Sequence, residues 1–174
     1  DTVFSMDGDI APLDEIVFLC KKYNCLSMVD EAHATGVLGK TGSGATELFG
    51  VQNKIDICMG TLSKAVGSVG GYIAGSNKLI DFLKNRARSF IFDTSLPGPA
   101  LEASIQSIRI IKEDRKLRKK LFNNICELTD FLKSSNFSYV DTSTPIIPII
   151  IGDEKKTLKT AEFLFENQIY IPAV

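Results

Sequence analysis

The sequence predicts an α/β fold with a mostly parallel central sheet and helices on both faces, and three observations support this. Short apolar runs of strand length alternate with amphipathic segments of helical spacing along most of the 174 residues. The candidate strands are almost continuously apolar, which is typical of parallel strands covered on both faces. Glycine-rich segments follow two of them. Because such sheets bind ligands beyond the carboxyl ends of their strands, residues at those ends are the first candidates for a site.

Each expected element follows from a local pattern. Pro12 suits the first position of a helix, and apolar residues recur behind it at intervals of three and four until Asn24. Asn77 is expected to cap a later helix, and the longest helical pattern breaks near Glu113. The expected helices are 12–24, 46–49, 77–87, 100–134 and 156–167. The expected strands are 25–29, 55–59, 70–74, 90–92, 137–140 and 146–151.

Composition excludes some classes of partner. The chain has 20 lysine and arginine residues against 21 acidic ones and a net charge of −1, which favours neither nucleic acid nor an anionic membrane surface. No apolar run approaches the ~20 residues that a membrane span needs. The four cysteines form no Cys-x-x-Cys pair, and we expect them to be reduced, buried residues of a cytoplasmic protein.

The two ends of the chain predict that it is an internal piece of a longer protein. Residues 1–5 resemble part of a strand that begins before residue 1, and residues 169–174 form another apolar strand-like run. The pattern changes after residue 134 to strand, strand, helix and strand. We therefore expect residues 1–134 to belong to a large domain and residues 135–174 to begin a smaller one.

Three residues at the expected strand ends suggest a site for pyridoxal 5'-phosphate (PLP). Asp30 closes an apolar run, and a charged carboxylate there needs a partner because burying it unpaired is costly. A protonated pyridine nitrogen would be one partner, and a helix cap or loop hydrogen bond is the alternative. His33, the only histidine, lies three residues further on and could contact the cofactor ring or its hydroxyl. Lys64 follows the next strand among small residues, which predicts a buried amine that readily becomes a nucleophile.

Two other kinds of site are less well supported. Asp30, Glu31 and His33 could bind a metal ion, but no second histidine or suitably spaced cysteine completes a ligand set, so we expect no metal. A phosphate-binding nucleotide loop requires Gly-Lys-Ser/Thr, whereas Ser63 precedes Lys64 here.

Four motifs in the same order resemble the α-oxoamine synthases, which are PLP-dependent transferases of fold type I. The resemblance covers essentially all of the chain. The matching segments are 3–13 (VFSMDGDIAPL), 30–39 (DEAHATGVLG), 60–71 (GTLSKAVGSVGG) and 143–148 (STPIIP). It implies a large PLP-binding domain and part of a smaller α+β C-terminal domain.

The resemblance also implies a role for each matching position. Lys64 would be the catalytic lysine that forms the Schiff base with PLP, and Asp30 would pair with the pyridinium nitrogen. His33 would hydrogen-bond the ring hydroxyl, and Ser5 would lie near the ring. The family's ring-stacking histidine and its substrate-binding arginine would lie outside residues 1–174.

Two further positions would bind the cofactor phosphate. Thr61 would do so within the chain, and Thr94 would do so across the interface of a homodimer. Asp93 departs from the family pattern, in which a small hydroxyl residue is common, and its carboxylate would repel a phosphate. Gly98 replaces a usual second proline, which would loosen this turn.

The implied activity is an acyltransferase reaction between an amino acid and an acyl thioester. The wording of the motifs around Asp30 and Lys64 is most similar to the members that condense L-alanine with pimeloyl-CoA, or pimeloyl-carrier protein, in biotin biosynthesis. The alternatives are a glycine C-acetyltransferase, a 5-aminolevulinate synthase or a serine palmitoyltransferase. A non-catalytic subunit or an inactive fragment of the same fold also remains open.

Overall fold

A three-stranded sheet lies at the centre of the computed structural model, which describes residues 1–174. The strands are β1 (Met28–Asp30), β2 (Ile57–Thr61) and β3 (Gly71–Gly75), in the order β1-β2-β3. β1 and β2 are parallel, whereas β2 and β3 are antiparallel. The predicted α/β class is confirmed, with one pairing of each kind where a mostly parallel sheet was expected. The short connection 62–70 explains the reversal, because a parallel return needs about a dozen residues or more.

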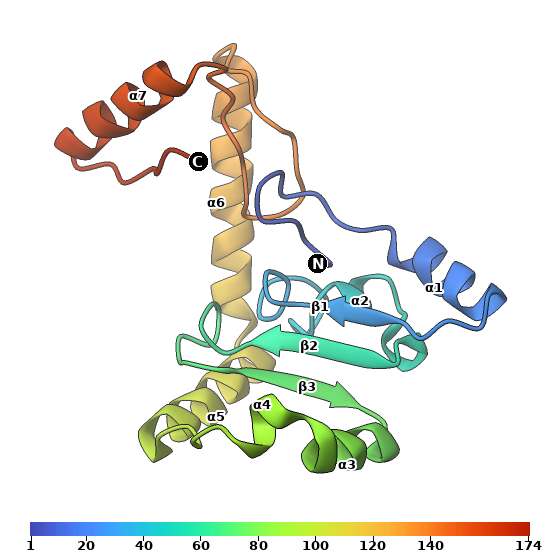
Figure 1. Ribbon diagram of the computed structural model, residues 1–174. Coiled ribbons are helices and arrows are strands. Elements are labelled where there is room, and N and C mark those ends of the chain that lie inside the picture. The colour runs from blue at the N-terminus through green and yellow to red at the C-terminus, as the bar shows by residue number, and fades with distance from the viewer.

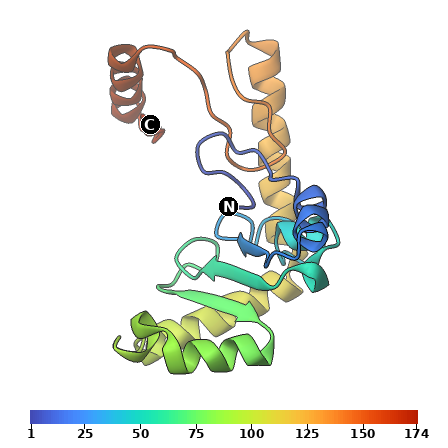
Figure 2. The same cartoon turned by 45° about the vertical axis from the view of Figure 1, so that its right-hand side comes forward.

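Seven helices surround and extend this sheet. They are α1 (Leu13–Lys22), α2 (Ala45–Leu48), α3 (Asn77–Arg86), α4 (Arg88–Ile91), α5 (Gly98–Glu113), α6 (Arg115–Ser134) and α7 (Glu154–Glu166), with a 3₁₀ turn at Gln52–Lys54. Figure 1 shows α1 and α2 beside β1, and α3 and α4 beside β3. In Figures 1 and 2, α6 rises away from the sheet, and α7 lies far from it. None of these helices is both long enough and apolar enough to cross a lipid bilayer.

The hydrophobic core lies between α1, β1 and the N-terminal segment. Leu13 and Val17 of α1 are buried against a cluster that includes Val3, Val29 and Ala45. Acidic residues in the first turn of α1 and lysines in its last turn favour the helix by complementing its dipole. This packing fixes the position of β1, at whose end the predicted site begins.

The break in the longest helical pattern is confirmed, and the chain changes direction there. Asp114 separates α5 from α6 and has extended backbone angles. Its carboxylate accepts a hydrogen bond from the backbone N–H of Lys116 at 2.7 Å, which caps α6. The cap of α3 differs from the prediction, because Ser76 rather than Asn77 accepts the bond from the N–H of Leu79.

The predicted strand at 90–92 is wrong, because these residues belong to the short helix α4 and its end. The N–H groups of Phe90 and Ile91 both donate to the carbonyl of Ala87, at 2.9 and 3.0 Å. Phe90 and Phe92 are exposed and have no neighbouring strand to pair with. Apolar content therefore predicted a strand where local hydrogen bonds form a turn of helix.

Other expected strands reduce to isolated bridges. Segments 137–140 and 146–151 pair only through Tyr139 and Ile149, and segment 1–5 pairs only through Val3 with Ile10. Residues 169–174 form no strand. The four cysteines are free. Cys25 and Cys126 are exposed and Cys20 and Cys58 are only partly buried, so the expected full burial is wrong.

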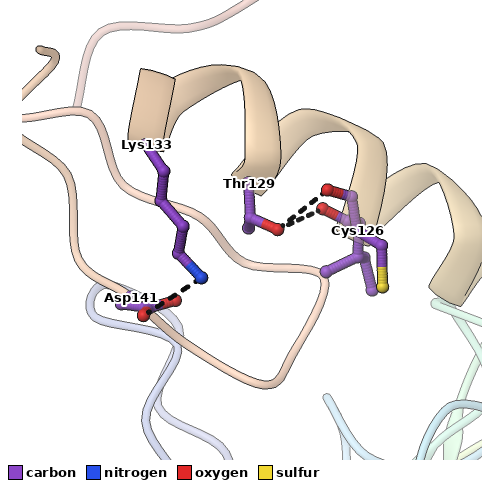
Figure 3. Close-up of polar contacts among 5 residues, drawn as sticks. Cys126, Thr129, Lys133 and Asp141 are labelled. Carbon is purple, nitrogen blue, oxygen red and sulfur yellow. Dashed lines mark hydrogen bonds and ion pairs between the residues drawn. The ribbon is translucent and has the colours of Figure 1, made fainter. Parts of the chain in front are cut away.

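The segment after α6 returns along the helix toward the N-terminal loop (Figures 1 and 2). Figure 3 shows the ion pair that joins Lys133 at the end of α6 to Asp141, with 3.6 Å between Nζ and Oδ2. Further along, the buried hydroxyl of Thr144 donates to the carbonyl of Gly8 at 2.7 Å. Gly8 has a φ of +71°, and a Cβ there would collide with the carbonyl oxygen of Ile146. This segment is therefore seated on the loop that precedes α1.

Candidate active site

Asp30 is held at the end of β1 by backbone hydrogen bonds on both sides. Its carbonyl accepts from the N–H of Thr2 at 2.9 Å, and the next N–H, that of Glu31, donates to the carbonyl of Met59 at 2.8 Å. The half-buried side chain uses Oδ1 to accept from the N–H of Ala32 at 2.8 Å, and no protein donor contacts Oδ2. The loop hydrogen bond and a free carboxylate oxygen therefore coexist, and the free oxygen suits a cationic ring nitrogen.

Lys64 and His33 are in direct contact. Lys64 Nζ lies 3.0 Å from His33 Nε2, although the two residues come from different loops. Partial burial lowers the pKa of His33, the Lys64 charge lowers it further, and the Asp30 charge opposes both effects. With the imidazole neutral, Nε2 accepts from the ammonium group and Nδ1 carries the proton. Since both charged groups act on one imidazole, the structure brings Asp30, His33 and Lys64 to one site.

The loop after β2 presents Lys64 to solvent. Leu62 and Val66 on either side of it are buried and anchor the loop, while Lys64 itself is exposed. The carbonyl of Lys64 accepts from the N–H of Gly67 at 2.9 Å, and Gly67 has a φ of +68°, which favours glycine. The predicted burial of Lys64 is wrong, because the small residues around it leave the amine open. An exposed amine is accessible to an incoming aldehyde cofactor.

Two hydroxyl groups lie close together at the start of the same loop. Thr61 Oγ1 is 2.8 Å from Ser63 Oγ, and it also accepts from the N–H of Ser63 at 3.2 Å. The Thr61 hydroxyl also donates a hydrogen bond to the carbonyl of Gly70 at 3.2 Å. Two hydroxyls next to a lysine form a group that suits an anion such as a phosphate, which would replace the contact of Thr61 with the carbonyl of Gly70.

Gly60 allows β3 to approach the end of β2 closely. It lies opposite Tyr72, and any side chain at Gly60 would collide with the Tyr72 ring. The Tyr72 hydroxyl is 3.2 Å from Thr35 Oγ1, and burial raises the pKa of Tyr72. The ring thereby connects β3 to the loop that contains His33.

The other two predicted site residues are not joined to this group within the chain. Ser5 lies exposed in the turn before Gly8, and Thr94 lies exposed between α4 and α5. The N–H of Thr94 donates to Asp93 Oδ1 at 2.8 Å, so this carboxylate is engaged by its own turn. Leu96 of the same turn packs against Gly70, which places the turn beside the Lys64 loop.

Glu31 lies next to Asp30, and the sequence did not indicate its structural role. It is 0% exposed and accepts three hydrogen bonds. The sequence suggested it only as a metal ligand, and no three His, Cys, Asp or Glu side chains are placed to hold a metal ion. Its position directly after Asp30 was the only sequence signal for this role. The groups that donate hydrogen bonds to it are distant in sequence.

Comparison with known proteins gives the family of the chain. An acid at one strand end and a lysine just past the neighbouring strand suit a PLP-dependent enzyme, and the solved structures that match the chain are PLP-dependent enzymes of fold type I. Residues 1–174 match the sequence model described as aminotransferase class I and II. The chain belongs to this family.

The most informative relatives are α-oxoamine synthases, which confirms the resemblance that the motifs indicate. The 8-amino-7-oxononanoate synthase of Treponema denticola is 49% identical over 170 residues, which is 98% of this chain and 43% of that protein. The 8-amino-7-oxononanoate synthase 2 of Bacillus subtilis is 49% identical over 174 residues, which is 100% of this chain and 44% of that protein. The chain thus spans less than half the length of these relatives.

Solved structures give the same family. Serine palmitoyltransferase of Sphingomonas wittichii matches with a TM-score of 0.92 and 33% identity, covering 98% of this chain and 43% of that one. The 8-amino-7-oxononanoate synthase of Francisella tularensis matches with a TM-score of 0.86 and 31% identity, covering 98% and 50%. These similarities establish the fold, while the choice between members depends on the sequence.

Proposed function

We propose that this chain forms part of a PLP-dependent acyltransferase that makes 8-amino-7-oxononanoate in biotin biosynthesis. The substrates would be L-alanine and pimeloyl-CoA or pimeloyl-carrier protein. A bond forms between the α-carbon of alanine and the thioester carbonyl carbon. The carrier thiol leaves that carbonyl, and the alanine carboxylate is released as carbon dioxide.

The observation that carries this proposal is the contact between Lys64 and His33, three residues after Asp30. The residues present fit PLP: an exposed amine, a carboxylate with one free oxygen, an imidazole and a pair of hydroxyls. PLP, when bound, supplies a ring that accepts electrons from the substrate α-carbon.

Each residue would have a separate task. Lys64 would hold the cofactor and then, as a free amine, take the proton from the substrate α-carbon. Asp30 would keep a proton on the ring nitrogen through its free oxygen, since a nearby carboxylate favours the cationic form. His33 would orient the ring hydroxyl, and Thr61 would donate to the phosphate.

Two contacts would complete the cofactor site from outside this group. Ser5 would lie near the ring, and Thr94 would reach the phosphate of the other subunit in a homodimer. The exposed position of Thr94, with no contact to Lys64 in its own chain, supports a role across an interface. We also propose a cytoplasmic protein in which residues 1–134 belong to the large domain and residues 135–174 begin the small one.

Sequence identity favours alanine and a pimeloyl thioester over the substrates of other family members. The relatives named 8-amino-7-oxononanoate synthase reach 49% identity, against 33% for the serine palmitoyltransferase structure. The similar TM-scores do not distinguish them, because the two enzymes share one fold.

The test is turnover by the full-length protein. Purified PLP-loaded protein is given pimeloyl-CoA with alanine, glycine or serine, and the released thiol is measured with a thiol reagent. We expect thiol release with alanine and formation of 8-amino-7-oxononanoate by mass spectrometry. Faster release with glycine or serine would contradict the substrate assignment and favour another α-oxoamine synthase.

A further inference from the structure

We propose that Glu31 is a positioning residue for Asp30, an inference that rests on the proposed function and extends it. Glu31 follows Asp30 directly and is completely buried. Oε2 accepts from the Thr2 hydroxyl and from the N–H of Ala45, both at 2.9 Å, and Oε1 accepts from the N–H of Thr46 at 2.8 Å. One carboxylate thus joins the end of β1 to the N-terminal segment and to the start of α2.

Hydrogen-bond donors surround the carboxylate of Glu31. All three partners donate to the carboxyl group, which is the hydrogen bonding that a carboxylate requires. Glu31 forms no salt bridge, so the three donors alone offset the cost of burying it. A Cβ at Gly44 would collide with this carboxylate, so glycine leaves the space that it occupies.

The same partners also fix Asp30. Thr2, which donates its hydroxyl to Glu31, donates its N–H to the carbonyl of Asp30 at 2.9 Å. The N–H of Glu31 donates to the carbonyl of Met59 in β2 at 2.8 Å. The backbone around Asp30 is therefore held from the β2 side and from the N-terminal side. Loss of the Glu31 carboxylate would leave Thr2 bonded only to the carbonyl of Asp30 and would separate the start of α2 from the strand end.

Glu31 also adds a second negative charge close to Asp30. After burial, which is the largest effect, the charges of Glu31 and Asp30 raise the pKa of Cys58 on β2 to about 11. Burial is also the largest effect that raises the pKa of Tyr72, and the same two carboxylates raise it further. Both charges therefore act on the same region, and the pair favours a cation at Asp30 more strongly than Asp30 would alone.

The test compares Glu31→Gln with wild type and with a matched control in the full-length protein. Glutamine keeps the size of the side chain but removes the charge and replaces one acceptor with a donor. Glu47→Gln is the control. Glu47 also accepts hydrogen bonds from backbone N–H groups, those of Thr41 and Ser43, but these residues belong to the loop just before it and do not contact Asp30. The readouts are PLP affinity of the apoprotein, the pH midpoint of the bound cofactor's visible absorbance, and the thermal midpoint.

We expect Glu31→Gln to weaken PLP binding about tenfold, since a buried group loses its partner. The pH midpoint should fall by about half a unit, because removing a negative charge disfavours the cationic form. Glu47→Gln should leave both quantities unchanged. A Glu31→Gln protein with a lower thermal midpoint but unchanged PLP affinity and pH midpoint would overturn the inference, because its role would then be structural only.

A second variant keeps the inference testable if Glu31→Gln does not fold. Thr2→Val removes the hydroxyl that bonds Glu31 at 2.9 Å and the carbonyl of Asp30 at 3.1 Å, and it retains the shape of the side chain. It should weaken PLP binding severalfold, and unchanged binding would overturn the inference. A wild-type protein that binds no PLP would instead contradict the proposed function.

Discussion

Lys64 Nζ and His33 Nε2 lie 3.0 Å apart, and this contact joins the loop after β1 to the loop after β2. The parallel pairing of these strands is what brings the two loops to one edge of the sheet. Asp30, at the end of β1, contributes its charge to the same imidazole. An acid, an imidazole and an amine therefore meet through the register of two strands.

Replacing Asp30 should impair catalysis more than folding. In Asp30→Asn, the side-chain carbonyl can still accept from the N–H of Ala32, so the local turn is retained. The ring nitrogen loses its charged partner, and kcat should fall about a hundredfold or more. Steady-state kinetics and a thermal melt of the same sample check this. A normal kcat in the Asp30→Asn variant would exclude the proposed pairing.

The stability of the apoprotein should depend on pH through His33. The folded pKa of His33 is below its ordinary value, so the unfolded chain binds more protons at mildly acidic pH. The contribution of His33 is therefore present above about pH 6.5 and is lost as the pH falls below that value. Denaturant unfolding at pH 7.5 and 5.5 measures it. His33→Gln should show a smaller loss of unfolding free energy on acidification than wild type, and an equal loss would contradict the lowered pKa.

Gly8 should not tolerate a side chain. Gly8→Ala would place a Cβ against the carbonyl of Ile146 at a φ of +71°. We expect it to cost about 2–4 kcal/mol of unfolding free energy, since neither the backbone nor the partner can move easily. Gly98→Ala is the matched control, because open space surrounds that position at the start of α5. It should change the unfolding free energy by less than about 1 kcal/mol, and equal effects of the two variants would refute this account.

Mixed dimers can show whether Thr94 acts on the other subunit. Lys64→Ala and Thr94→Val should each impair their own homodimers. If Thr94 serves the partner's cofactor, a mixed dimer of the two contains one intact site and should recover about half of wild-type activity. Activity is measured on dimers purified with two different affinity tags. No recovery would place Thr94 in the site of its own chain.

The sequence indicated candidate site residues but not their surroundings. Asp30 and Lys64 could be found because each follows an apolar run that forms a strand, and strand ends of an α/β sheet are where ligands bind. The exposure of Lys64 could not be predicted, because it depends on how Leu62 and Val66 anchor the loop. Glu31 could not be assigned either, since its partners lie 29 residues before it and 14 and 15 residues after it along the chain.

For the fold, too, features set by neighbouring residues could be predicted, whereas some features set by other contacts could not. The break between α5 and α6 was predictable because Asp114 provides a local cap. The helical turn at α4 was not, because Phe90 and Phe92 suggest a strand by composition alone. The direction of β3 follows from the short connection after β2, which the expected strands 55–59 and 70–74 already implied but which was not used to predict an antiparallel pair.

Identifying the amine that holds the cofactor tests the central claim most directly. The full-length protein is loaded with PLP, reduced with borohydride and digested, and the modified peptide is sequenced by mass spectrometry. We predict that the label lies on Lys64 and is absent from Lys64→Ala. A label on another lysine, or none in a protein that turns over substrate, would contradict the account.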